Sequence, residues 1–236
     1  MTPLANNHIS IDCVVFGFDG QSLHVLLVKR NGEDQGGEYN DMKLPGSLIY
    51  QDEDLDEAAS RVLHELTGIK DVSMRQFKAF GSRNRTSNPR DVLWLERAQQ
   101  AKVERIVTVG YFAVVKIDAP QLRTLDQEQA IWCPVDRVGN LAFDHNLIID
   151  EALKAFRREA DFNRSMIFDL LPRKFTATEL RLVAEIVQSK PLDVCNFHKK
   201  IAQMPYVVPL DERQKGVAHR AARYYKFDRK IFNTSR

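Results

Sequence analysis

The sequence has few cysteines and no long apolar run, and both absences exclude classes of protein. Its three cysteines, Cys13, Cys133 and Cys195, are too few and too far apart for a disulfide framework or a Cys-x-x-Cys zinc site. No segment reaches the roughly 18 consecutive apolar residues of a membrane-spanning helix, and the first residues lack the basic and apolar stretches of a signal peptide. We therefore expect a cytoplasmic protein with no membrane partner.

The composition is that of a globular protein with one or two domains. The chain has 236 residues, of which 44% are hydrophobic. Its net charge of +2 conceals an asymmetry, because residues 1–162 carry 19 Lys and Arg against 25 Asp and Glu, whereas residues 163–236 carry 15 against 7. The first part therefore has a charge of −6 and the second a charge of +8. Charge alone leaves two interpretations of the basic part open, a nucleic-acid-binding module or a solvated surface.

The first part of the chain alternates between strand-like and helical patterns. Two apolar runs, Ile9–Phe18 and Leu23–Lys29, flank Asp19-Gly20, a dipeptide that suits a hairpin turn. The pattern then predicts, in chain order, a glycine-rich loop over residues 31–41, a tight turn over Leu44–Ile49, a helix over Leu55–Leu66 that ends at Gly68, and strands over Met74–Phe80 and Ile106–Ile117. The polar stretch Ser82–Glu104 has a helical middle, and we expect it to be an insertion over a pocket or a partner.

The basic part has the pattern of a winged helix. Thr176 and Glu179 form a capping-box sequence ahead of one helix, and Asp193 is a suitable N-cap for a second helix that runs to about Met204. The remaining predicted elements are a linking helix over Ile148–Arg158, strands over Tyr206–Leu210 and Val217–Phe227, and a turn over Asp211–Gly216. In a winged helix, the second helix enters the major groove of DNA and the hairpin lies along the backbone.

One motif carries information about chemistry. The segment LPGSLIYQDEDLDEAASRVLHELTGI, residues 44–69, resembles the Nudix box, a loop-helix-loop that holds Mg²⁺ against a diphosphate. Alignment on Gly68 places Glu53, Arg61 and Glu65 at three of its positions. The departures are Ser47 for the opening glycine, and Val62 and Leu66 for two helical glutamates.

These departures argue against hydrolysis. Positions 62, 65 and 66 share one helix face, and in an active member all three would present carboxylates to the same metal cluster. Only Glu65 is left, and a single carboxylate can scarcely build a multi-metal site. We therefore expect no catalytic residues, no metal site and no cofactor, with a Nudix hydrolase as the rival interpretation.

The resemblance extends over the rest of the chain. A Nudix-like domain followed by a basic winged helix is similar to the Nudix-related transcriptional regulators, in which the Nudix domain senses a metabolite. Stretches that match their DNA-binding half begin at Phe175, Pro191 and His219. The resemblance implies an α+β fold, with a Nudix-type α/β/α sandwich and mixed sheet over residues 1–158 and a C-terminal winged helix-turn-helix domain over residues 159–236.

The same resemblance implies a ligand-responsive regulator that binds a double-stranded DNA operator as a homodimer. One branch of the family binds ADP-ribose and controls NAD metabolism, and another responds to sugars such as arabinose. The segment RVLHELTG looks closer to the second branch, and a pocket with fewer metal carboxylates suits a neutral sugar. We therefore expect a pentose-type effector and a sugar catabolic operon, with an ADP-ribose-sensing regulator as the alternative.

Candidate site residues follow from these assignments. Candidates for the ligand site are Glu53, Arg61, Glu65, Arg83, Arg85, Arg90 and Tyr111. Candidates for DNA contact are Asn196, His198, Lys199, Lys200, Arg220, Arg223 and Lys226. We interpret His145, which follows Asp144 at a predicted helix start, as a local hydrogen-bonding or capping element rather than a ligand residue.

Overall fold

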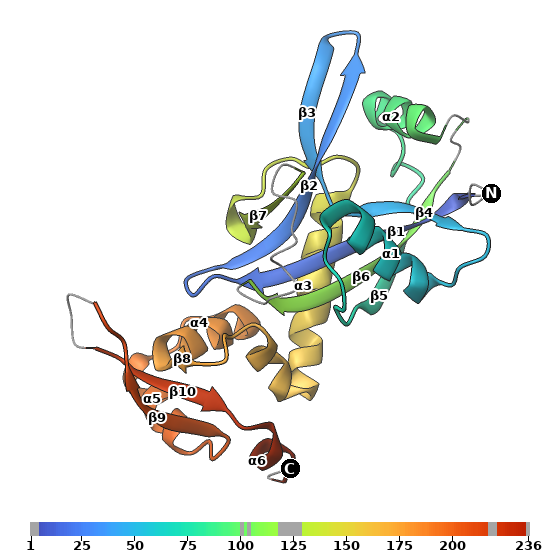
Figure 1. Cartoon of the computed structure of the whole chain (residues 1–236). Helices are drawn as coiled ribbons and strands as arrows, with labels where there is room; N and C mark the ends of the chain where they lie inside the picture. Colours follow the sequence, from blue (N-terminus) through green and yellow to red (C-terminus); the bar gives the residue numbers. More distant parts are fainter. Residues whose placement is uncertain (1–4, 100–101, 103–104, 118–128, 217–220, 235–236) are drawn as a thin grey trace. The chain divides into compact units, whose positions relative to one another are not determined.

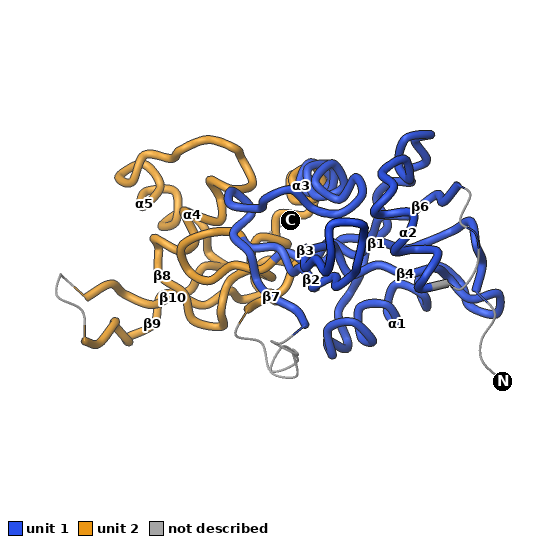
Figure 2. The backbone as a smooth tube through the Cα atoms, turned by 90° about the horizontal axis from the view of Figure 1, so that it is seen from above, with its two compact units in different colours: residues 1–16, 24–113, 120–155 blue, residues 17–23, 114–119, 156–236 orange. Residues whose placement is uncertain are grey.

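The computed structural model describes residues 5–99, 102, 105–117, 129–216 and 221–234 (Figure 1). These residues form two compact units, one built mainly from residues 24–113 and one mainly from residues 156–236 (Figure 2). The predicted division after residue 158 falls inside helix α3 (His145–Phe162). In the described part of the chain, no helix is long and apolar enough to cross a membrane.

The N-terminal unit is built on a mixed sheet in the order β3-β2-β1-β6-β5, with β4 paired to β1 and β7 paired to β2. Its strands are β1 (Ala5–Phe18), β2 (Leu23–Asp34), β3 (Gly37–Lys43), β4 (Gly46–Tyr50), β5 (Arg75–Phe80), β6 (Val107–Lys116) and β7 (Ala130–Pro134). Helices α1 (Leu55–Thr67) and α3 lie on opposite faces of the sheet (Figures 1 and 2). This is the α/β/α sandwich that the sequence predicted.

Burial explains the apolar run of the central strand. Consecutive residues of β1 from Cys13 to Phe16 are all fully buried, because helices cover both faces of the sheet. Ala58, Val62 and Leu63 pack from α1, and Ile148 and Ala152 are buried on α3. The C-terminal glycine of α1 was predicted correctly: Gly68 has φ +75°, and its N–H donates to the His64 carbonyl.

The glycine-rich loop expected over residues 31–41 is wrong. Strand β2 continues to Asp34 and β3 starts at Gly37, so the segment forms a long hairpin with Gly32 opposite Tyr39. A Cβ on Gly32 would lie 2.3 Å from the Tyr39 hydroxyl oxygen. Because glycine has no Cβ, the Tyr39 ring can pack directly over the backbone of Gly32. Composition suggested a loop, but cross-strand packing of the aromatic ring stabilises a hairpin.

The prediction of a tight turn over Leu44–Ile49 is correct only for its first residues, because the later ones form a strand. Strand β4 begins at Gly46, and its register on β1 places Ser10 opposite Leu48 and Asp12 opposite Gly46. A Cβ on Gly46 would lie 2.0 Å from the Asp12 carboxylate. A glycine is therefore needed here for the close approach of Asp12.

The C-terminal unit is a winged helix, as predicted. It contains η3 (Arg164–Asp169), β8 (Phe175–Thr176), α4 (Ala177–Gln188), α5 (Val194–Ala202), β9 (Val207–Arg213), β10 (Arg223–Phe227) and α6 (Arg229–Thr234), with strand order β8-β10-β9. The Thr176–Glu179 capping box is present, and the Asp193 carboxylate accepts from the Asn196 N–H at 2.8 Å. The Phe168 and Phe227 rings stack with centroids 4.0 Å apart and anchor the hairpin to the core.

Three element boundaries in this unit differ from the prediction. Helix α5 ends at Ala202, β9 extends to Arg213, and β10 begins at Arg223, so part of the expected turn is strand. The hydrogen bond from the Gln214 N–H to the Ala222 carbonyl continues the hairpin beyond the predicted strand end. Residues 217–220 lie outside the described residues.

Candidate functional site

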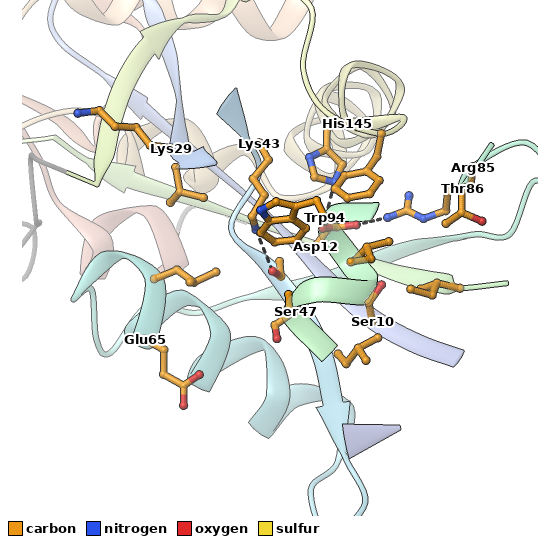
Figure 3. Close-up of a pocket in the computed structure, with 18 of the residues that line it drawn as sticks. Ser10, Asp12, Lys29, Lys43, Ser47, Glu65, Arg85, Thr86, Trp94 and His145 are labelled. Carbon is orange, nitrogen blue, oxygen red and sulfur yellow. Dashed lines mark hydrogen bonds and ion pairs between the residues drawn. The ribbon is translucent and has the colours of Figure 1, made fainter. Parts of the chain in front are cut away.

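The N-terminal unit contains a cavity of about 320 Å³ (Figure 3). This volume is at the lower end of the range for small-molecule sites, about 300–1,000 Å³. Its polar lining residues are Ser10, Asp12, Lys29, Lys43, Ser47, Glu65, Arg85, Thr86, Gln129 and His145. Its apolar lining residues are Val28, Leu48, Leu66, Trp94, Leu95, Ala98, Ile106 and Phe143.

A buried ion-pair network forms part of the cavity wall. Arg85 Nη2 donates to Asp12 Oδ2 at 2.6 Å, and Arg85 Nη1 donates to the Asp144 carboxylate. The side chains of Asp12 and Arg85 are each 5% exposed. Although burial opposes its ionisation, the neighbouring His145 and Arg85 hold the pKa of Asp12 well below its ordinary value. The pair is thus a fixed, ionised feature of the site.

Lys43 is the second buried cation of this wall. Its Nζ donates to the Leu44 carbonyl at 3.1 Å and to the Gly46 carbonyl at 2.9 Å, which braces the turn between β3 and β4 (Figure 3). Burial lowers the pKa of Lys43 to about 8, while the nearby Asp12 carboxylate opposes this shift.

Our interpretation of His145 as a local capping element is wrong. The Leu44 N–H donates to His145 Nδ1 at 2.9 Å, so the contact spans 101 residues of sequence. Because Nδ1 accepts this bond, Nε2 is the ring nitrogen that carries a proton. Nε2 is buried, lies 3.4 Å from Asp12 Oδ1 and has no hydrogen-bond partner among the described residues. Figure 3 shows this ring nitrogen directed at Asp12, so His145 and Asp12 form one polar pair at the cavity wall.

The Nudix-box residues Glu53, Arg61 and Glu65 are brought together. Arg61 Nε and Nη2 donate to Glu53 at 2.8 and 2.5 Å, and Nη1 donates to Glu65 Oε2 at 3.0 Å. The hydrogen bonds from Arg61 lower the pKa of Glu53. Arg61 also donates to the Leu48 carbonyl and stacks on the Tyr50 ring. These residues brace the loop and the helix against each other, and of the three only Glu65 lines the cavity.

The residues present do not fit the metal cluster that a Nudix box implies. Val62 is fully buried, Leu66 is an apolar lining residue, and Glu65 is about half exposed and bonded to Arg61. No group of three or more His, Cys, Asp or Glu side chains in the described part of the chain is arranged to hold a metal ion. Mg²⁺ requires hard oxygen ligands, and these positions supply one.

The other sequence-predicted ligand residues are dispersed. Arg85 lines the cavity, whereas Arg83 is exposed and does not. Arg90 is exposed on α2 (Pro89–Gln99), where it pairs with Asp34. Tyr111 is buried in the core, with its hydroxyl donating to the Asp56 carboxylate at 2.6 Å, and it does not line the cavity.

Sequence reasoning missed Asp12, Lys43, Trp94, Phe143 and His145 as lining residues. Asp12, Lys43, Phe143 and His145 reach the cavity through pairings between distant segments, for which the local sequence gave no signal. The expectation that the Ser82–Glu104 insertion covers a pocket was correct, since Trp94, Leu95 and Ala98 of α2 line the cavity.

Helix α2 is fixed to the sheet by a fully buried arginine on β2. Arg30 Nη1 donates to Asp91 Oδ1 at 2.6 Å, and Arg30 Nε donates to Asp41 at 2.7 Å. The other oxygen of Asp91 accepts from the Phe143 N–H at 3.0 Å. This arginine therefore holds the helix that carries Trp94 in a defined position.

The winged helix presents a separate polar surface. Asn196, His198, Lys199 and Lys200 are exposed on α5, whereas Phe197 and Ile201 on its other side are buried. Arg223 and Lys226 are exposed on β10. Arg223 also donates to the Leu210 carbonyl at 2.8 Å. Arg220 lies outside the described residues.

Comparison with known families is consistent with this architecture. The family model described as "NUDIX domain" matches residues 6–156. The chain belongs to the Nudix family. In this Nudix protein, a second model, described as "NrtR DNA-binding winged helix domain", matches residues 167–227. The predicted combination of a Nudix domain and a regulator-type winged helix is therefore confirmed.

Individual relatives match over almost the whole Nudix protein. A protein of Acinetobacter baylyi named "ADPR responsive transcriptional repressor NtrR" is 27% identical over 93% of this chain and 81% of its own length. The crystal structure of Shewanella oneidensis NrtR is 25% identical, with TM-score 0.66, and 94% of each chain is covered. A MutT/nudix family protein from Enterococcus faecalis shares the fold, with 21% identity, TM-score 0.59 and coverage of 94% and 88%.

Proposed function

We propose that this Nudix protein is a transcriptional repressor whose binding to DNA is controlled by ADP-ribose. The observation that carries the proposal is the presence of a Nudix domain and an NrtR DNA-binding winged helix domain in one chain. A ligand changes DNA affinity when it binds one conformational state more tightly than the other. The name of the Acinetobacter baylyi relative supports both the repressor role and the effector.

ADP-ribose replaces the pentose-type effector that the sequence suggested. That expectation depended on the short segment RVLHELTG, whereas the relative that matches 93% of the chain is named for its response to ADPR. No relative described above is named for a sugar, so the sugar catabolic operon has no support from them. The alternative, an ADP-ribose-sensing regulator of NAD metabolism, fits better.

In this proposal the Nudix domain is a sensor without catalytic activity. Val62 and Leu66 stand where the Nudix box has carboxylates, and Arg61 engages Glu65. We expect no Mg²⁺-dependent turnover of ADP-ribose, NADH or dinucleoside polyphosphates. A robust rate with any of the three would favour the rival hydrolase function.

Helix α5 and the β9–β10 hairpin form the proposed DNA interface. Asn196 and His198, at the N-terminal part of α5, are the candidates for contacts to base edges. Lys199, Lys200, Arg223 and Lys226 are the candidates for phosphate contacts, together with Arg220 outside the described residues. Because paired winged helices match the two halves of a palindromic operator, we also propose a homodimer.

Selection of binding sites from a random double-stranded DNA library tests the proposed function. The expected result is enrichment of one palindromic sequence, with affinity that falls steeply as salt rises. Light scattering of the selected complex should give two protein chains per operator. Enrichment of no sequence would contradict the repressor function, and one chain per operator would contradict the dimer.

A further inference from the structure

Two departures of this chain from the Nudix pattern line the same cavity. Leu66 occupies a position where the Nudix box has a metal-binding carboxylate, and Trp94 and Leu95 belong to the helix of the insertion. With Leu48 they form an apolar lining that we call the apolar wall, defined by Leu48, Leu66, Trp94 and Leu95. The carboxylate of an active Nudix box is thus replaced by a surface that favours an uncharged ligand group.

Trp94 is held rigidly in this wall (Figure 3). Its indole Nε1 donates to the Asn31 carbonyl at 3.1 Å, and its ring makes an edge contact with Phe143, with centroids 6.3 Å apart. The Arg30 guanidinium lies 5.7 Å from the indole centroid. An aromatic side chain that is fixed before binding loses little entropy when a flat ligand group packs on it.

The rest of the cavity has the opposite character. Arg85 is a buried cation that is paired with Asp12 and Asp144, and His145 Nε2 lies 3.4 Å from Asp12 Oδ1. Lys43 is a second buried cation, whose Nζ donates to two carbonyls and lies 5.6 Å from the centroid of the Trp94 ring. The Lys43 ammonium has three N–H donors, of which two bind carbonyls, so it can also bind an oxygen atom of the ligand, and the Asp12 carboxylate can accept from a sugar hydroxyl. One cavity therefore combines an apolar wall with donors for polar oxygens.

We propose that the apolar wall binds the nucleobase of the effector, and that the insertion therefore makes this protein recognise a nucleotide rather than a free sugar. The inference rests on the proposed function, because it specifies which part of ADP-ribose the wall contacts. Base-aromatic stacking tolerates any base, and the Trp94 donor is already bonded to Asn31, so the wall recognises the base by its flat apolar faces.

A ligand series on the unmodified full chain tests the inference by calorimetry. ADP-ribose and AMP share the base, whereas ribose 5-phosphate and arabinose lack it. We expect AMP to bind and ribose 5-phosphate to bind at least about tenfold more weakly, since stacking of one base is worth that factor or more. Equal binding of AMP and ribose 5-phosphate would overturn the inference.

Tryptophan fluorescence gives a second readout, because the chain has two tryptophans. In the Trp132→Phe variant Trp94 is the only tryptophan, and ADP-ribose should change its emission. The Trp94→Leu variant should lose at least about tenfold in affinity, and Trp94→Phe should retain most of it. Trp132 lies on β7 outside the cavity lining, so Trp132→Phe should bind ADP-ribose like the unmodified protein.

The outcomes separate this inference from the proposed function. If ADP-ribose binds the unmodified chain, but Trp94→Leu binds it equally well and Trp94 emission does not change, the inference is wrong and the proposed effector stands. If the unmodified chain binds no adenine ligand, the proposed effector and the inference are both wrong.

Discussion

The backbone N–H of Leu44 donates to Nδ1 of His145 across 101 residues of sequence. This bond joins the turn before strand β4 to the first residue of helix α3. It also leaves the other ring nitrogen facing Asp12 at the cavity. Two segments with no local sequence relationship thus define the polar part of the site.

Removal of the His145 ring should destabilise the protein. His145→Ala leaves the buried Leu44 N–H without its acceptor, which costs about 1–3 kcal/mol, and the lost ring adds a cavity. Urea denaturation of His145→Ala and of the exposed control His64→Ala measures the difference in unfolding free energy. Equal stability of the two variants would show that this bond contributes nothing.

Asp12 should contribute stability that depends on pH. Its pKa lies well below the ordinary value of 3.8 in the folded state, so the unfolded chain binds the proton more readily. The stability advantage of the unmodified protein over Asp12→Asn is therefore present above about pH 4 and shrinks as the pH falls further. Denaturation at several pH values measures it, and exposed Asp161→Asn is the control. An advantage that grows on acidification would contradict the assignment.

Val62 and Leu66 replace two carboxylates of the Nudix box, and the protein should tolerate a glutamate at these two positions to different degrees. Val62 is fully buried, so Val62→Glu places a charge in the core and should cost several kcal/mol of folding free energy. Leu66 lines the cavity, so Leu66→Glu should fold with much smaller loss. Thermal denaturation compares the two variants, with Leu66→Gln as an uncharged control. A stable Val62→Glu protein would show that the core accepts the carboxylate.

Much of the fold could be predicted because its signals are local. The Gly68 cap, the Thr176–Glu179 capping box and the Asp193 N-cap depend on residues within one helical turn. The β2–β3 hairpin could not be predicted, because it depends on packing of Tyr39 across Gly32. The polar part of the cavity depends on the Leu44–His145 and Asp12–Arg85 contacts, for which no spacing rule exists.

The phosphate contacts of α5 should be independent of sequence. Lys199→Ala and Lys200→Ala should weaken binding to operator and to unrelated DNA alike, and each should reduce the slope of log affinity against log salt by about one. Lys154→Ala on α3 is the control outside the winged helix. Fluorescence anisotropy over a salt series measures the slopes. If both variants keep the DNA affinity and the salt dependence of the unmodified protein, α5 does not belong to the DNA interface.

Release of DNA by the effector tests the central claim most directly. The measurement is anisotropy of a labelled operator, selected as described above, with ADP-ribose or arabinose added to the preformed complex. In the proposed function ADP-ribose binds more tightly to the conformational state with the lower DNA affinity, so it should lower the affinity of the protein for its operator, and arabinose should leave this affinity unchanged. Release by arabinose with no effect of ADP-ribose would contradict the account.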